Sequence, residues 1–180
     1  MKVLLDTCVL YPTVMREVLL GVAAQGLFTP LWSARILEEW ARAARKIGPE
    51  GETQARGEIA LVRTAWPQAE VSWKPSLEAR LWLPDAGDVH VLAAAVAGSA
   101  DLILTVNAQD FPRGVLAEEG LSRADPDGFL LGLWQATPET VAGVAETVRQ
   151  RAETLSGAPW AIRDLLKKTR LPRLAKALSS

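Results

Sequence analysis

The chain has 180 residues, with 20 lysines and arginines against 21 aspartates and glutamates, and its formal net charge is -1. This length corresponds to one domain, and the 49% hydrophobic and 23% charged residues are ordinary globular usage, which excludes a disordered chain or a coiled coil. The near-zero charge balance also excludes a surface that is strongly cationic overall. A nucleic-acid partner would therefore need locally clustered charge.

Cysteine content and the shortness of the apolar segments indicate the compartment. The single Cys8 cannot form an intrachain disulfide, which points to a reducing environment. The apolar start Val3–Leu5 is interrupted by Asp6 and is too short for a signal-peptide core. Val91–Ala97 falls far short of the ~20 residues that a bilayer requires. We therefore expect a soluble, cytoplasmic protein that has no contact with membranes.

The first fifty residues alternate between strand and helix patterns. Val3–Leu5 is typical of a buried strand, and Phe28–Trp32 is a weaker strand candidate. Apolar residues at helical spacing predict a helix that ends near Gly26, namely Val14, Val18, Leu19 and Val22. Ser33 is a good N-cap for a second helix, which stops at Gly48. The residues that this helix turns inward are Ile36, Leu37, Trp40 and Ala44.

The rest of the chain continues this alternation up to about Pro126 and is helical from there on. Further strands are predicted at Glu70–Trp73, Leu102–Val106 and Gly120–Arg123, and further helices at Glu50–Trp66, Ser76–Trp82 and Asp88–Ala97. The C-terminal helices are predicted at Phe129–Gln135, Pro138–Leu155, Pro159–Lys168 and Arg173–Leu178. Strands that alternate with helices in this way predict an α/β fold with a parallel sheet.

Acidic residues follow the predicted strands at positions where ligands gather in parallel α/β sheets. Asp6 ends the first strand, and Asp110 comes shortly after the Leu102–Val106 strand together with Asn107. Asp88 opens a helix after a loop, and a glutamate, Glu38 or Glu39, lies one turn into the Ser33 helix. These four positions are far apart in the sequence, so only the fold could bring them together. Each alone also has a structural explanation as a helix cap, a turn residue or a solvated helix residue.

Four segments of the chain resemble the PIN-domain nucleases. They are Leu4-Leu-Asp-Thr7, Ile36-Leu-Glu-Glu-Trp40, Asp85-Ala-Gly-Asp-Val-His-Val-Leu-Ala-Ala-Ala95 and Ala100-Asp-Leu-Ile-Leu-Thr-Val-Asn-Ala-Gln-Asp-Phe-Pro112. The likeness runs from about Val3 to Leu131. Within the family the chain is most similar to the bacterial toxin–antitoxin type, the virulence-associated protein C-like branch, through its Thr-x-Asn-x-x-Asp-Phe ending and its helical C-terminal extension.

This resemblance implies a three-layer α/β/α fold with a central five-stranded parallel sheet. It implies a PIN-like nuclease domain over 1–131 and a helical extension over 132–180 that packs on the same domain. The implied function is a metal-dependent endoribonuclease that hydrolyses RNA phosphodiester bonds, as the toxin of a toxin–antitoxin pair. The implied partners are an RNA substrate, a cognate antitoxin protein that covers the acidic pocket, and a second copy in a homodimer.

The family's catalytic and metal-binding positions fall on Asp6, Glu39, Asp88 and Asp110 of this sequence. Glu39 matches better than Glu38, although both remain open. Asn107 stands where many members of the family have aspartate, which leaves the fourth carboxylate to Asp110 alone. Oxygen ligands of this kind select a hard cation, so the expected cofactor is Mg²⁺ or Mn²⁺. Hydrogen bonds that orient these ligands are expected from Thr7, Thr105 and Asn107.

A basic segment near the C-terminus has two interpretations. Lys167, Lys168 and Arg170 either grip RNA phosphates or form an ordinary solvated helix face. The sequence also admits two other functions for the whole chain. One is a catalytically weak RNA-binding or regulatory module on the PIN fold, motivated by Asn107. The other is an α/β phosphatase with Asp6 as nucleophile, although Cys8 occupies the position where such enzymes carry a second carboxylate.

Overall fold

A five-stranded parallel sheet forms the centre of the computed structural model, which describes all 180 residues. The strand order is β3-β2-β1-β4-β5. The strands are β1 (Lys2–Leu5), β2 (Thr29–Ser33), β3 (Glu70–Val71), β4 (Leu102–Leu104) and β5 (Ser122–Ala124). This architecture confirms the three-layer α/β/α fold with a five-stranded parallel sheet that the resemblance implied.

The apolar character of β1 places it in the middle of the sheet. Leu4 lies opposite Leu31 of β2 on one side and Ile103 of β4 on the other, and all three side chains are almost completely buried. A strand that is covered on both faces needs apolar residues at every position, which explains the continuous run Val3–Leu5. Because β1 is followed directly by Asp6, the chain delivers a carboxylate to the carboxyl edge of this sheet.

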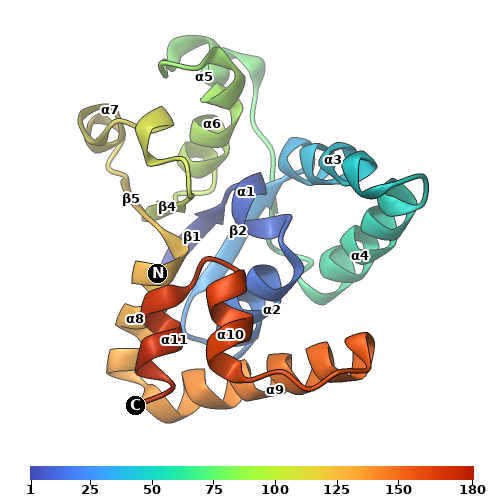
Figure 1. Cartoon of the computed structure of the whole chain (residues 1–180). Coiled ribbons are helices and arrows are strands. Elements are labelled where there is room, and N and C mark those ends of the chain that lie inside the picture. The colour runs from blue at the N-terminus through green and yellow to red at the C-terminus, as the bar shows by residue number, and fades with distance from the viewer. The chain divides into compact units, whose positions relative to one another are not determined.

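Contacts within the chain divide it into two compact units, and the sheet belongs to the unit made of Met1–Tyr11 and Thr29–Ala124. Its helices are α1 (Thr7–Leu10), α3 (Ala34–Ala43), α4 (Gly51–Ala65), α5 (Pro75–Arg80), α6 (Val89–Ala97) and α7 (Arg113–Glu118). Right-handed crossovers place α3 and α4 on one face of the sheet, and α5, α6 and α7 on the other. Figure 1 shows these two groups on either side of the strands.

The local signals around α3 act as the sequence predicts. The Ser33 hydroxyl accepts a hydrogen bond from the Ile36 backbone N–H at 3.1 Å, which is the expected N-cap. The α-helix ends at Ala43, and a 3₁₀ turn, η1 (Ala44–Ile47), continues it up to Gly48. Gly48 has a φ of 141°, a conformation that only glycine adopts readily, so the chain can turn sharply there.

The strand β4 ends two residues earlier than the sequence predicts. Its apolar run continues to Val106, but the Val106 backbone N–H donates to the Cys8 sulfur at 3.4 Å and the Asn107 N–H to the Thr105 hydroxyl at 3.0 Å. The chain therefore leaves the strand ladder in order to make contacts near Asp6. Two 3₁₀ turns, η2 (Ala86–Asp88) and η3 (Ala108–Asp110), carry the remaining acidic positions.

The second unit consists of Pro12–Phe28 and Asp125–Ser180 and contains helices only. These are α2 (Thr13–Ala24), α8 (Pro126–Ala136), α9 (Pro138–Ser156), α10 (Ile162–Lys168) and α11 (Pro172–Ala177). Helices α2 and α9 pack closely, because a Cβ atom at Gly21 would come within 2.5 Å of Val144 Cγ1. The Asp127 carboxylate fixes the start of α11 by accepting hydrogen bonds from the Arg173 and Leu174 backbone N–H groups at 2.9 and 3.0 Å. The division between residues 131 and 132 stays a prediction.

None of these helices combines the length and the continuous apolar character that crossing a bilayer would require.

Candidate active site

Asp6 is the most firmly held of the acidic residues. Its side chain is 5% exposed, and its Oδ1 atom accepts a hydrogen bond from the Thr7 backbone N–H at 2.7 Å. Its Oδ2 atom accepts from the Thr105 hydroxyl at 2.8 Å and from the Cys8 thiol at 3.3 Å. Thr7 and Thr105 thus contact the carboxylate from the ends of two neighbouring strands.

Burial governs the ionisation of Asp6 and of its neighbour Cys8. Loss of solvent raises the pKa of Asp6, although the hydrogen bonds from Thr105, Cys8 and Thr7 partly offset the effect, and the charge of Glu39 adds to the increase. Burial, together with the charge of Asp6, raises the pKa of the Cys8 thiol to about 12. Cys8 is therefore a neutral hydrogen-bond donor to Asp6 at physiological pH rather than a reactive thiolate.

Glu39 reaches the same region from α3. Its Oε2 atom lies 3.0 Å from the Thr7 hydroxyl, and its Oε1 atom lies 2.8 Å from Nε2 of His90 on α6. Partial burial opposes ionisation of Glu39, but the contacts with His90, Thr7 and Arg35 outweigh it, so that the pKa of Glu39 lies below its ordinary value. Glu39 is therefore an anion with both oxygens positioned by neighbours.

Glu38, the alternative to Glu39, has different partners. It accepts two hydrogen bonds from Arg56 at 2.9 Å and one from Arg42 at 3.2 Å, on the exposed surface of α3 and α4. These arginines lower the pKa of Glu38 to about 2. Its charge is thus already neutralised within the protein, whereas that of Glu39 is directed toward Asp6.

Asp88 has the most perturbed carboxyl group of the four. Burial raises its pKa to about 6, and the negative charges of Asp6, Asp85 and Asp110 add to the increase. Its side chain makes no capping hydrogen bond at the start of α6, so the simple explanation of Asp88 as a helix cap does not hold. Asp85 caps the preceding turn instead, with Oδ1 accepting from the Gly87 N–H at 2.8 Å.

A cavity of about 350 Å³ collects these residues at the carboxyl edge of the sheet. Three of the four predicted carboxylates line it, and Asp110 does not, although its charge acts on Asp88. The lining consists of Asp6, Thr7, Cys8, Tyr11, Glu39, Ala43, Lys46, Asp88 and Asn107. Asn107 is exposed at this cavity, as expected from its position after β4.

Two residues of this region are absent from the sequence prediction. Lys46 comes from η1 and is the only cation that lines the cavity; nothing in its local sequence indicates this position. His90, near the start of α6, is 1% exposed and contacts Glu39. Its spacing of two residues from Asp88, across the start of a helix, hides this contact.

The donor set fits a hard divalent cation in its chemistry. All the acidic groups are oxygen ligands, and a cation would relieve the repulsion that adds to the effect of burial on the pKa of Asp88. The side-chain oxygens nevertheless do not converge on a common position, because no group of three His, Cys, Asp or Glu residues is arranged to hold a metal ion. Binding an ion would therefore require side-chain rotation toward the cavity.

Comparison with known proteins gives the class of this fold and site. The sequence pattern of the PIN domain matches residues 2–109, which is more than half of the chain. The chain belongs to the PIN domain family. PIN domains are generally nucleases that act on RNA, and they typically depend on divalent metals. None of the curated proteins and none of the solved structures matches the chain.

Proposed function

We propose that the protein is a metal-dependent endoribonuclease that hydrolyses RNA phosphodiester bonds. The observation that carries this proposal is the cavity in which Asp6, Glu39 and Asp88 meet with Lys46 as the only cation. Burial is the main cause of the raised pKa of Asp88, and the negative charges of Asp6, Asp85 and Asp110 add to it. A protein keeps such an arrangement where a cation is bound in function.

In this proposal Asp6, Glu39, Asp88 and Asp110 hold Mg²⁺ or Mn²⁺. Such an ion supplies an activated water and offsets the charge of the phosphate group. The protein contributes the positions of the ligands: Thr105 and the Thr7 N–H hold the two oxygens of Asp6. Lys46 lines the same cavity, where it can attract an anionic RNA backbone. Asn107 can donate a hydrogen bond from its side-chain amide to substrate or water.

A cleavage assay on a mixed RNA pool tests the proposal. The wild-type protein is compared in Mn²⁺ and in EDTA with the variant Asp88→Asn, and Glu38→Gln serves as the control because Glu38 is paired with arginines. We expect cleavage by the wild type and by Glu38→Gln in Mn²⁺ only, and none by Asp88→Asn. Cleavage that continues in EDTA would contradict the metal dependence.

We further infer a place for this nuclease in a toxin–antitoxin pair. The support is the resemblance of the Thr105–Phe111 segment to that branch of the family, together with the open acidic cavity. A small antitoxin would restrain the enzyme by covering this cavity, and a homodimer and a cytoplasmic location belong to the same proposal. Expression of the protein with and without a co-expressed neighbouring gene product, with growth as the readout, tests it.

Asn107 favours a second candidate function. It lies at the cavity where many relatives carry an aspartate, so a weakly catalytic RNA-binding module would retain the observed site with one ligand fewer. The substitution Asn107→Asp distinguishes the two. A large gain in cleavage rate in Mn²⁺ would support the weak-enzyme alternative, whereas unchanged cleavage would show that Asp6, Glu39, Asp88 and Asp110 suffice.

A further inference from the structure

The cations of α10 and of the turn that follows it differ from most arginines of this chain in having no carboxylate partner. Arg163, Lys167, Lys168 and Arg170 are exposed, and none has a carboxylate oxygen within 4.0 Å, although Asp164 shares the segment. The arginines that do pair with carboxylates are Arg35, Arg42, Arg45, Arg56, Arg63, Arg80, Arg149, Arg151 and Arg173. Positive charge is therefore left unneutralised in one short segment of the second unit.

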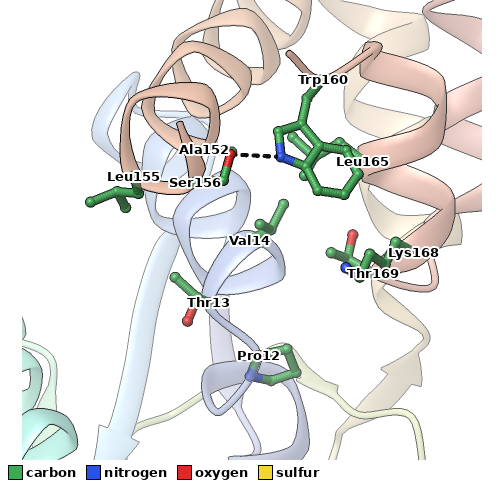
Figure 2. Close-up of a pocket in the computed structure, with 10 residues that line it drawn as sticks. All are labelled: Pro12, Thr13, Val14, Ala152, Leu155, Ser156, Trp160, Leu165, Lys168 and Thr169. Atoms are coloured by element: carbon green, nitrogen blue, oxygen red, sulfur yellow. Dashed lines mark hydrogen bonds between the residues drawn. The ribbon is translucent and has the colours of Figure 1, made fainter. Parts of the chain in front are cut away.

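An apolar cavity of about 480 Å³ adjoins this segment within the second unit. Its walls come from α2, α9 and α10 and from the connection between the last two, as Figure 2 shows. The lining residues are Pro12, Thr13, Val14, Ala152, Leu155, Ser156, Trp160, Leu165, Lys168 and Thr169. The cavity is thus mainly apolar, with hydroxyl groups and a single charged residue, Lys168.

Trp160 is held in place at this cavity. Its indole Nε1–H donates to the Ser156 hydroxyl at 3.2 Å (Figure 2). Its backbone N–H donates to Glu153 Oε1 at 3.0 Å. The ring is half-buried and lies beside Leu165 in the cavity. The ammonium group of Lys168 lies over the ring, 5.0 Å from its centroid. A fixed aromatic surface and a cation therefore occur together at one side of the cavity.

We propose that this part of the second unit is a binding site for single-stranded RNA. Lys167, Lys168 and Arg170 bind phosphates, and an unpaired base enters the apolar cavity beside Trp160. Cations and an aromatic ring are the two groups that sequence-independent binding of single strands requires. The apolar walls exclude a paired base, whose edges need polar partners. The choice of RNA rests on the proposed function, whereas Trp160 and the cations lie beyond residues 2–109, which the PIN pattern matches.

Phosphate contacts and base stacking contribute separately to the affinity for RNA. The experiment therefore measures both the affinity and its dependence on salt. The affinity of a fluorescent oligouridylate is measured by anisotropy over a range of salt concentrations, in EDTA and in an Asp6→Asn background, so that no cleavage interferes. Lys167→Ala/Lys168→Ala is compared with Lys74→Ala/Lys176→Ala, which removes the same charge from exposed positions elsewhere. Arg170 is left unchanged so that the variant and its control each lose two charges.

We expect the Lys167/Lys168 variant to lower the slope of log affinity against log salt by about 1.4, since each phosphate contact on a single strand contributes about 0.7. The control pair should retain the slope of the parent protein. Trp160→Leu should weaken binding by about fivefold or more at every salt concentration without changing the slope, because base stacking is not ionic. Circular dichroism verifies that each variant is folded.

Two results would overturn the proposal. One is a slope that does not differ between the Lys167/Lys168 variant and its control. The other is equal binding of poly-glutamate and of RNA with no effect of Trp160→Leu, which would identify the site as a surface for acidic protein segments. Cleavage by the wild type in Mn²⁺ is assayed separately. Absent cleavage with the expected slopes would refute only the nuclease function, and cleavage with unchanged slopes would refute only the RNA site.

Discussion

His90 Nε2 lies 2.8 Å from Glu39 Oε1, although the histidine is 1% exposed and the glutamate side chain is 39% exposed. Neither the Nδ1 nor the Nε2 atom of His90 makes a hydrogen bond, so the approach to Glu39 is an electrostatic contact. A buried polar ring costs free energy unless its contacts compensate for lost solvation, and the charge of Glu39 offers such compensation. His90 therefore acts as a positioning residue that holds the glutamate toward the cavity shared with Asp6.

Replacing His90 should disturb Glu39 without touching the RNA. We expect His90→Leu to lower kcat for RNA cleavage by about 10- to 100-fold, the usual effect of removing a group that orients a metal ligand. KM should remain within about twofold, and His90→Gln, which keeps a donor, should recover part of the rate. An equal loss of activity in both variants at unchanged melting temperature would contradict the positioning role.

The two glutamates of α3 provide a matched pair of variants. Glu39→Gln removes an anion from the cavity and should lower the cleavage rate by at least about tenfold in Mn²⁺. Glu38→Gln alters only the exposed contacts with Arg56 and Arg42, and cleavage should stay close to wild type. Steady-state kinetics on one RNA substrate decides between them. If Glu38→Gln were the inactive variant, the assignment of the ligand to Glu39 would be wrong.

The raised pKa of Asp88 makes stability depend on pH when no metal is present. Its pKa is about 6 in the folded protein against an ordinary value of 3.8, so the folded state binds more protons between these values. The free energy of unfolding should therefore fall as pH rises from about 4 to about 6. Carboxylates with a lowered pKa, such as Glu38, act in the opposite direction, so the contribution of Asp88 is read as the difference between wild type and Asp88→Asn in urea denaturation in EDTA at a series of pH values. The stability of the wild type relative to Asp88→Asn should fall between about pH 4 and about pH 6. A difference that stays constant or rises over this interval would contradict the raised pKa of Asp88.

Millimolar Mn²⁺ should reverse that destabilisation. An ion that binds only the folded state raises the melting temperature, by about 2–4 °C for each kcal/mol of stabilisation in a protein of this size. We expect the increase in the wild type and in Asp164→Asn, whose carboxylate lies on α10 in the other unit, but not in Asp88→Asn. The same increase in all three proteins would remove Asp88 from the ion site.

Local patterns were sufficient for the fold because they act over short distances. The run Val3–Leu5 is apolar at each position and forms the central strand, and Ser33 caps α3 as its residue type indicates. The strand around Ile103 ends early because Thr105 and Val106 take part in contacts with residues near Asp6. Such contacts arise only after folding, so periodicity cannot place the end of this strand.

The sequence indicates which residues reach the cavity where they directly follow a strand, and it is less informative for residues in other positions. Asp6 and Asn107 reach the cavity because parallel strands end at one edge, and Asp88 reaches it from the turn before α6. Asp110 is the last residue of the 3₁₀ turn η3, and the structure leaves it outside the lining. His90 escaped prediction because a two-residue offset at a helix start does not define the side-chain direction.

The order in which the chain visits its two units has a consequence for how it can be divided. It leaves the sheet unit after Tyr11, returns at Thr29, and leaves again after Ala124. Helix α2 therefore lies between the first two strands in the sequence, but it packs through Gly21 against α9. No single cut yields either unit intact, and truncation at residue 125 would strip α2 of its neighbour. The C-terminal helices therefore cannot be removed without exposing the face of α2 that packs on α9, and the two units have to be produced as one chain.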